Sequence, residues 1–229
     1  MNGLDQGEDE GTSDDGGVRA ALVSLPAAPG AEAHEPFAGA DHPMRQLTRA
    51  SAAGEPFGTE QSARVQQVFD AMAASWSEDH VDKVKAAPVA DALERGDVPL
   101  DGDWLEVGSG TGAGARVLHG RVGSLVCTDL AMEMLRHAPD LAPRLRSDAS
   151  RLPFTKNRFD AVLLINMLLF PDEVDRVLRA DGVVVWVNTL GDQTPIHLPP
   201  HDVLAALPGS WTGVTAAAGT GFWLVARRR

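Results

Sequence analysis

The sequence predicts an α/β fold of the Rossmann-like, doubly wound kind, with a mostly parallel seven-stranded sheet and a terminal antiparallel hairpin. Three observations lead to this prediction. Strand-like apolar runs alternate with helical segments from residue 103 onward, a glycine-rich turn follows the first run, and two strand-like runs separated by three residues come last. Repeated strand–helix units with apolar strands are typical of parallel sheets covered by helices on both faces.

Residues 1–60 lack a sustained hydrophobic period. They are rich in Gly, Ala and Pro, and they hold 11 of the 32 acidic side chains but only 3 of the 20 basic ones. Such a composition does not favour burial of a core. We therefore expect an acidic, mostly disordered leader over residues 1–60, with some order near residues 43–49.

The folded domain is expected over residues 61–229, and its first part, residues 61–98, should be helical and cover the site. Apolar residues from Val65 to Trp76 fall at helical spacing, which predicts an amphipathic helix over 61–75. A second helix is predicted from about 80 to 95, interrupted near Pro88 and ended by Gly96. Trp76 lies in the polar hinge between the helices, where an aromatic side chain could cover a pocket and touch a substrate.

The remaining elements follow from the alternation of apolar runs and amphipathic segments. Strands are predicted at 103–107, 124–128, 144–147, 159–165 and 183–188, and helices at 111–119, 131–138, 172–179 and 201–207. The runs 211–217 and 221–227 are joined by Ala218-Gly219-Thr220, which predicts the hairpin at the sheet edge.

Charge and composition exclude several classes of function. The net charge is -12 and no basic stripe occurs, so we expect no nucleic-acid partner. A single cysteine, Cys127, forms no internal disulfide and suits a reducing cytoplasm. No apolar run approaches the ~20 residues that span a bilayer, and the first residues do not form an export signal, so a cytoplasmic protein without membrane contact is expected. The oligomeric state is not indicated.

The glycine-rich turn is the strongest candidate for a binding site. Glu106 ends the first apolar run, and Gly108, Ser109, Gly110 and Gly112 follow before the next helix. Glycines let the backbone turn sharply and approach a ligand closely. The free N–H groups and the dipole at the start of the helix favour a carboxylate or a phosphate.

A second candidate, Asp129, ends the next strand 21 residues after Gly108. A carboxylate at this distance from a glycine turn can accept both hydroxyls of a ribose. Three further motifs follow in order, over residues 147–154, 158–167 and 176–185.

With these five motifs, residues 65–229 resemble the class I S-adenosylmethionine-dependent methyltransferases. The likeness is greatest to the small single-domain branch that includes ubiquinone/menaquinone-type enzymes. The order and spacing of the motifs carry the resemblance, together with the helix and hinge at 68–76. One departure is Ala180-Asp181-Gly182, where the family usually has a proline and two glycines. The departure affects a turn, not the expected cofactor site.

The resemblance implies a role for each candidate residue. The glycines and Ser109 would line the methionine and ribose part of S-adenosylmethionine, with Glu106 nearby. Asp129 would bind the ribose hydroxyls, and Leu130 would lie against the adenine. Asp148 and Ala149 would meet the adenine edge, while Asn166 and Met167 would face the methionine and the substrate. Asp148 could alternatively cap a turn, and Asn166 could satisfy backbone groups at a strand end.

The expected reaction is methyl transfer to a small-molecule acceptor through an oxygen, nitrogen or carbon nucleophile. A sulfonium methyl is already activated, so alignment of the reactants can supply much of the acceleration. Where the nucleophile must lose a proton, a general base adds further rate. His80, His197 and His201 are candidates for such a base, and His197 is the first to test because it lies in a stiff loop after the fifth strand.

Other functions remain open at this stage. The glycine turn and Asp129 also fit an NAD(P)-dependent oxidoreductase, although Glu106 would stand beside the pyrophosphate and the sequence has no tyrosine. A nucleic-acid methyltransferase would need a Pro-Pro-aromatic run after the fourth strand, where Asn166 and Met167 stand instead. A metal-assisted, catechol-type methyltransferase would need carboxylates at the end of the fourth strand. Asn166 stands there and is a weak magnesium ligand, so no metal is expected. A catalytically silent cofactor-binding module that mediates interactions is the non-enzymatic alternative.

Overall fold

The computed structural model describes residues 21–32, 42–76 and 80–229, apart from the side chains of residues 80–85. Its strands are β1 (Leu22–Ser24), β2 (Asp103–Val107), β3 (Ser124–Asp129), β4 (Arg144–Arg146), β5 (Phe159–Ile165), β6 (Leu178–Asn188), β7 (Trp211–Ala218) and β8 (Gly221–Arg228). Its helices are α1 (Pro43–Ala52), α2 (Thr59–Trp76), α3 (His80–Arg95), α4 (Ala113–Leu118), α5 (Met132–His137), α6 (Pro171–Val177), the 3₁₀ turn η1 (Gly191–Gln193) and α7 (Pro200–Ala206). Within the described ranges, no helix has the length and apolar character that a bilayer span requires.

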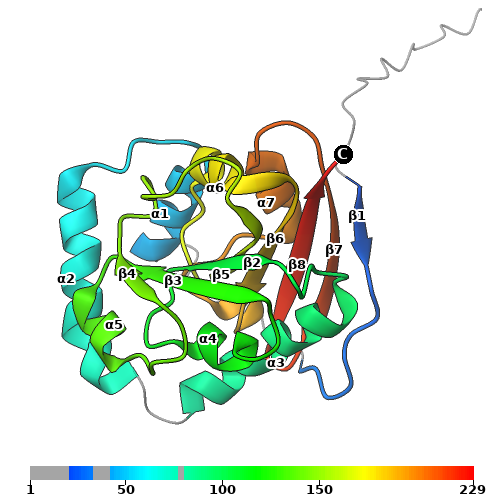
Figure 1. Cartoon of the computed structure of the whole chain (residues 1–229), viewed down its shortest axis with the longest axis horizontal. Helices are drawn as coiled ribbons and strands as arrows, with labels where there is room; N and C mark the ends of the chain where they lie inside the picture. Colours follow the sequence, from blue (N-terminus) through cyan, green and yellow to red (C-terminus); the bar gives the residue numbers. More distant parts are fainter. Residues whose placement is uncertain (1–20, 33–41, 77–79) are drawn as a thin grey trace, which may run out of the picture.

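The eight strands form one sheet in the order β1-β7-β8-β6-β5-β2-β3-β4 (Figure 1). Strand β8 runs antiparallel to both of its neighbours, β6 and β7, and every other pair is parallel. The predicted α/β fold with a terminal antiparallel hairpin is therefore confirmed. The sheet has eight strands where seven were predicted, because β1 adds to the outer side of the hairpin.

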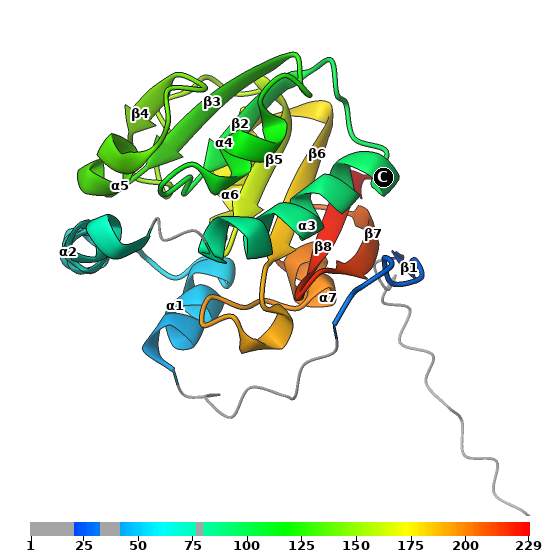
Figure 2. The same cartoon turned by 90° about the horizontal axis from the view of Figure 1, so that it is seen from below.

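The central strands are buried on both faces, as their continuous apolar sequences require. Along β5, alternate side chains enter two different core clusters: Phe159, Val162 and Leu164 belong to one, and Ala161, Leu163 and Ile165 to the other. The first cluster packs beneath α6 and α7, and the second beneath α3 and α4. Figures 1 and 2 show these helix pairs on opposite faces of the sheet. The helix α2 stands beside the sheet, next to α5 (Figure 2).

Two segments of the predicted leader have regular structure, and one of them includes residues 43–49, where some order was expected. Residues 22–24 pair in parallel with residues 213–215 of β7, and residues 43–52 form α1. Beyond β1, the backbone N–H groups of Leu25, Ala28 and Glu32 also donate to carbonyl groups of the hairpin. Backbone pairing to an open strand edge depends little on side-chain hydrophobicity, so composition did not reveal it. Residues 1–20 and 33–41 of the predicted leader lie outside the described residues.

The predicted interruption of the second helix at Pro88 does not occur. Helix α3 runs through Pro88 without a break, although proline cannot donate the helical hydrogen bond at that position. Val89, Ala92 and Leu93 on the same helix are buried in the second core cluster. Burial of this face offsets the lost hydrogen bond, since packing decides the stability of most helices in proteins.

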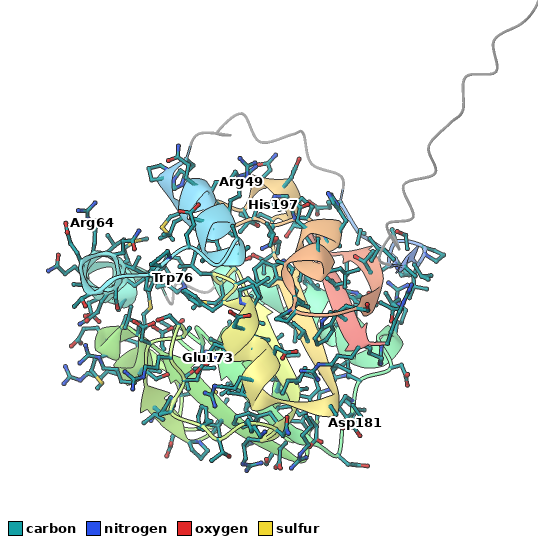
Figure 3. The ribbon with its side chains drawn as sticks, turned by 90° about the horizontal axis from the view of Figure 1, so that it is seen from above. Arg49, Arg64, Trp76, Glu173, Asp181 and His197 are labelled. Atoms are coloured by element: carbon teal, nitrogen blue, oxygen red, sulfur yellow. The ribbon has the colours of Figure 1, made fainter. Side chains whose placement is uncertain are left out.

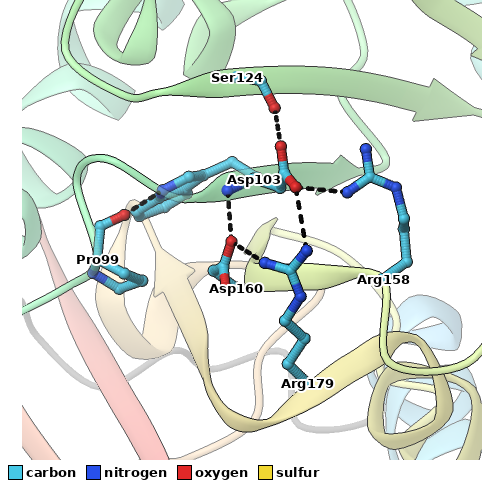
Figure 4. Close-up of polar contacts among 7 residues, drawn as sticks. Pro99, Asp103, Ser124, Arg158, Asp160 and Arg179 are labelled. Atoms are coloured by element: carbon cyan, nitrogen blue, oxygen red, sulfur yellow. Dashed lines mark hydrogen bonds and ion pairs between the residues drawn. The ribbon is translucent and has the colours of Figure 1, made fainter.

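A polar network joins the strands at their amino ends, away from the glycine turn (Figure 4). The carboxylate of Asp103 accepts hydrogen bonds from Ser124 Oγ (2.5 Å), Arg158 Nη1 (2.5 Å) and Arg179 Nη2 (3.2 Å). Asp160 accepts from Arg179 and from the backbone N–H of Asp103 (2.7 Å). The network therefore connects β2, β3, β5 and β6 at one end of the sheet and leaves the other end for the site.

Candidate functional site

A cavity that is partly open to solvent lies at the carboxyl ends of β2, β3, β4 and β5. The end of α2 covers it, and Trp76 extends from that helix toward the sheet (Figure 3). Most of the residues that the sequence suggested for cofactor binding line this cavity: Glu106, Gly108, Ser109, Gly110, Asp129, Leu130, Asp148, Ala149, Asn166 and Met167. Trp76 lines it too, whereas Gly112 is not among the lining residues.

The turn after β2 needs glycine for two separate reasons. Gly108 and Gly110 have φ values of 70° and 54°, in the left-handed region that side chains disfavour. A Cβ on Gly108 would lie 2.3 Å from Sδ of Met167, whereas one on Gly110 would meet nothing nearer than Nε1 of Trp76 at 4.0 Å. Close packing therefore excludes a side chain at Gly108, and at Gly110 the turn presents bare backbone beside Trp76.

Gly112 has a different function in the fold. It precedes the first residue of α4, with a φ value of 83°. A Cβ there would lie 3.0 Å from Cδ of Pro139. Its position fits packing against the segment after α5, which differs from the ligand contact predicted for it.

Asp129 is held by the backbone on both sides of its carboxylate. Oδ2 accepts from the N–H of Gly110 (2.8 Å) and Oδ1 from the N–H of Ala131 (2.8 Å). Burial raises the pKa of Asp129, although these N–H groups act to lower it. A carboxylate has about four acceptor positions, so acceptor capacity remains for a ligand. Two hydroxyl donors from a ligand would stabilise the charged form.

Glu106 lies beneath the first turn of α4 and is almost fully buried. A Cβ on Gly114 would be 2.2 Å from its Oε1, so glycine is required there for Glu106 to fit. The thiol of Cys127 donates toward Oε2 at 3.6 Å. Burial, and then the negative charge of Glu106, raise the pKa of that thiol, so Cys127 stays protonated and unreactive.

Three buried hydroxyl oxygens in this region, those of Ser109, Thr111 and Ser147, have no hydrogen-bond partner among the described residues. Ser109 and Ser147 line the cavity. Leaving a buried hydroxyl unpaired costs roughly 1–3 kcal/mol. A polar ligand in the cavity would supply the missing partners of Ser109 and Ser147, so these two residues fit a ligand with hydrogen-bonding groups.

Asp148 caps a turn, which is one of the two roles considered for it, and it also lines the cavity. Oδ1 accepts from the backbone N–H of Ser150 (2.9 Å) and from its hydroxyl (2.7 Å). Oδ2 accepts from the hydroxyl of Ser62 on α2 (2.8 Å). One acceptor position of Oδ2 remains for a donor from a ligand.

Asn166 lines the cavity, but its amide group bonds to the chain after β6. Nδ2 donates to Oγ1 of Thr189 (2.7 Å), and Oδ1 accepts from the N–H of Thr189 (2.9 Å). The residue has a φ of 47°, a conformation that asparagine tolerates better than most residues. The amide thus joins the ends of β5 and β6. The side chain of Met167, in contrast, packs against Gly108 in the turn after β2.

The part of the cavity beside β5 and β6 is apolar, and none of its residues was among the site residues predicted from the sequence. It is lined by Met44, Phe57, Leu168, Phe170 and Ile196. The rings of Phe57 and Phe170 meet edge to face, with centroids 5.2 Å apart. Met44 and Phe57 lie in the segment assigned to the leader. For Met44 the signal in the sequence was local: Pro43 stands at a helix start and is followed by apolar residues three positions apart, Met44 and Leu47.

Of the three histidines proposed as bases, His197 and His201 are not among the residues that line the cavity. His197, labelled in Figure 3, is half-buried. Its ring lies 5.9 Å from that of Phe222. Burial and the charges of Arg45 and Arg49 lower the pKa of His197 to about 4. His201 is exposed on α7, 3.0 Å from Asp202. His80 begins α3, and its side chain lies outside the described residues.

Comparison with known proteins agrees with this geometry. Residues 105–186 match the model of a methyltransferase domain. The structure of DhpI in complex with SAH has a TM-score of 0.59 and 22% identity, over 75% of this chain and 98% of that one. A SAM-dependent methyltransferase from Aquifex aeolicus has a TM-score of 0.56 and 16% identity, over 69% of this chain and 96% of that one.

Other similarities are partial. The chain matches the putative methyltransferase solved with the Trm112 activator of Haloferax volcanii at 23% identity and a TM-score of 0.46. That alignment covers 52% of this chain and spans 59% of the other protein's length. No curated protein sequence gives a significant match.

The fold and the matched domain define the class. The chain carries a methyltransferase domain with the Rossmann-like class I fold, that of the S-adenosylmethionine-dependent methyltransferases.

Proposed function

We propose that this protein transfers a methyl group from S-adenosylmethionine to a small, apolar acceptor molecule in the cytoplasm. We further propose that it belongs with the small single-domain methyltransferases whose motifs it resembles. The observation that carries the proposal is the placement of Asp129. Its carboxylate is held by Gly110 and Ala131 at one wall of the cavity, with acceptor capacity directed toward a ligand.

The polar part of the cavity, beside β3 and β4, would hold the adenosine. Asp129 would accept the ribose hydroxyls, and Asp148 would accept the exocyclic amine of the adenine. Leu130 and Ala149 would contact the ring. The backbone of Gly108 and Gly110, with the hydroxyl of Ser109, would bind the amino-acid part above the buried Glu106. These assignments use every predicted cofactor residue that lines the cavity except Asn166 and Met167, which would shape the side facing the acceptor.

The apolar part, beside β5 and β6, would hold the acceptor. The cofactor supplies an electrophilic methyl group on a sulfonium, and the protein's task is to align a nucleophile with it and exclude water. The described residues that line this part have no ionisable side chain: Met44, Phe57, Leu168, Phe170 and Ile196. We therefore propose an uncharged acceptor whose oxygen, nitrogen or carbon nucleophile needs no buried base. The catalytic unit would begin near residue 42, because α1 supplies Met44.

Isothermal titration calorimetry with S-adenosylhomocysteine and with NAD tests the cofactor assignment. Wild-type protein should bind S-adenosylhomocysteine and not NAD. Asp129→Asn should weaken this binding by about 1.5–3 kcal/mol, the range for hydrogen bonds to a charged group. Asp140→Asn, an exposed carboxylate on the loop after α5, is the matched control and should bind as wild type does. Binding of NAD alone would overturn the proposal in favour of an oxidoreductase.

Turnover is tested separately from binding. Protein loaded with radiolabelled S-adenosylmethionine should transfer label to apolar acceptors from a small-molecule library. Ile196→Glu, which puts a charge into the apolar part, should abolish transfer while leaving S-adenosylhomocysteine affinity within about twofold. Cofactor binding with no transfer to any acceptor would instead support a silent interaction module.

A further inference from the structure

We propose that Ser62 is a positioning residue that couples the closure of α2 over the cavity to recognition of the adenine amine by Asp148. The inference rests on the proposed function, because it takes Asp148 to be the partner of the adenine. It adds a residue on a separate element, distant in sequence, for which no motif gave a signal.

Polar contacts help to hold α2 in place, because few of its side chains are fully buried. Ala73 is its one fully buried side chain, and Val68 and Met72 are 49% and 40% exposed. Apart from a small cluster with α5, the helix therefore has little core burial to fix it. Elements with few buried apolar contacts are the ones that open most readily.

Three of these polar contacts come from one stripe of the helix. Ser62, Gln66 and Asp70 are spaced four residues apart, so they lie on the same face. Ser62 donates to Oδ2 of Asp148 (2.8 Å), and Oε1 of Gln66 accepts from Arg146 (2.8 Å). Oδ1 of Asp70 accepts from the N–H of Glu133, at the start of α5 (2.9 Å). The stripe thus attaches α2 to the loop after β4, to β4 itself and to α5.

The neighbouring stripe of α2 covers the cavity. Val65, Phe69 and Trp76 line it, and the rings of Phe69 and Trp76 meet edge to face with centroids 5.7 Å apart. When Ser62 bonds to Asp148, these apolar side chains lie over the polar part of the cavity. Closure of the helix and the orientation of the Asp148 carboxylate are therefore set by the same hydrogen bond.

The geometry of Asp148 makes this coupling specific to an amine. Ser150 occupies Oδ1 with two donors, and Ser62 donates to Oδ2. The remaining acceptor position of Oδ2 suits an N–H donor such as the amine at C6 of adenine. An oxo group at C6 is itself an acceptor, so it would repel the Asp148 carboxylate instead of donating to it. This repulsion would displace Asp148 whether or not the Ser62 hydroxyl is present.

The test compares two ligands and four proteins by calorimetry. The ligands are S-adenosylhomocysteine and S-inosylhomocysteine, which has an oxo group at C6. The proteins are wild type, Ser62→Ala, Ser62→Thr and Ser75→Ala. Ser75 is the matched control, because it lies on the same helix and its hydroxyl donates to the carbonyl of Met72 (3.1 Å), its one hydrogen-bond partner among the residues that the structure describes.

Ser62→Ala should weaken S-adenosylhomocysteine binding about 5- to 20-fold and change S-inosylhomocysteine binding less than twofold. Ser62→Thr keeps the hydroxyl and should restore binding to within about threefold of wild type. Ser75→Ala should match wild type with both ligands. Circular dichroism of each unliganded variant checks that the fold is retained.

The contrary outcomes are distinct. Equal losses for both ligands would mean that Ser62 only holds the helix, and they would overturn the coupling. Unchanged binding of S-adenosylhomocysteine by Ser62→Ala would overturn it too, with the proposed function intact. Failure of the wild-type protein to bind S-adenosylhomocysteine would overturn the proposed function and, with it, this inference.

Discussion

At the scale of single residues, His197 shows how position changes the chemistry of a side chain. The sequence suggested it as a general base because it lies in a proline-rich loop after a strand. In the structure its ring is half-buried beside Phe222, and positive charge from Arg45 and Arg49 disfavours protonation. The negative charges of Asp192 and Asp202 raise the pKa of His197, but by less than burial and the two arginines lower it. His197 is therefore neutral at pH 7 and contributes to folding through its unprotonated form.

This neutral histidine predicts a pH dependence of stability. The pKa of His197 is about 4 in the folded protein, against 6.5 for an unperturbed histidine. Between these values the unfolded chain binds more protons, so the free energy of unfolding should fall as pH drops from 6.5 to 4. Because the ring is partly exposed, we expect a contribution of about 1–2 kcal/mol.

Urea unfolding from pH 4 to 7 measures this contribution. His197→Asn should show a smaller decline in stability at low pH than wild type does. His201→Asn, on the exposed start of α7, should behave like wild type. An identical pH profile for all three proteins would show that His197 is not shifted.

Some residues and contacts of the site could be predicted from the sequence, and others could not. Gly108, Gly110 and Asp129 were predictable because a tight turn and a strand-end carboxylate leave a fixed spacing in the sequence. The pairing of Asn166 with Thr189 was not, because it depends on two strand ends meeting in space. Ser62 gave no signal either, since its partner Asp148 is 86 positions away.

At the scale of elements, long periodic segments were predictable and short or edge elements were not. The helix predicted over 61–75 is α2, and the strands predicted over 103–107 and 159–165 match β2 and β5. Pro88 misled the prediction for α3, because a local rule was outweighed by burial of Val89, Ala92 and Leu93. The helix α1 has ten residues, and its docking depends on contacts with a loop near residue 192.

Arg45 is the main polar attachment of α1. Its guanidinium donates to the carbonyl groups of Asp192 and Thr194, the latter at 3.1 Å, and the side chain is almost fully buried. Arg45→Met should remove hydrogen bonds from a charged donor worth about 1.5–3 kcal/mol to the docking of α1. Amide hydrogen exchange in residues 43–52 should then accelerate about 10- to 100-fold, with β5 and β6 unchanged.

Arg49→Met is the matched control for this prediction. Arg49 lies on the same helix with an exposed side chain, so its replacement should leave exchange in α1 near the wild-type rate. Equal acceleration in both variants would mean that general charge, not the buried hydrogen bonds, holds the helix.

At the scale of the whole molecule, the two ends of the sheet serve different purposes. The cavity occupies the carboxyl ends of the strands, and the Asp103 network joins their amino ends (Figure 4). Mutations in the network should therefore change stability without changing ligand affinity.

Asp103→Asn tests this separation. Hydrogen bonds from Ser124 and Arg158 lower the pKa of Asp103, so its charge stabilises the fold above the normal titration range of a carboxyl group. Since the side chain is 31% exposed, we expect a loss of about 1 kcal/mol, or about 2–4 °C in Tm. Affinity for S-adenosylhomocysteine should not change.

The control is Asp101→Asn, a carboxylate on the loop just before β2. It should leave both Tm and affinity unchanged. A change in S-adenosylhomocysteine affinity for Asp103→Asn would show that the two ends of the sheet communicate.

The added strand β1 has a consequence for the order in which the molecule assembles. Leu22 pairs with Gly213, so this contact closes a loop of about 190 residues, among the longest the chain can form. It also depends on β7 having already been paired by β8. We expect β1 to join last during refolding and to fray first under stress. Because the chain continues from β1 to α1, which supplies Met44 to the cavity wall, a protease or a chaperone that bound the frayed strand would act on the segment that leads to the cavity.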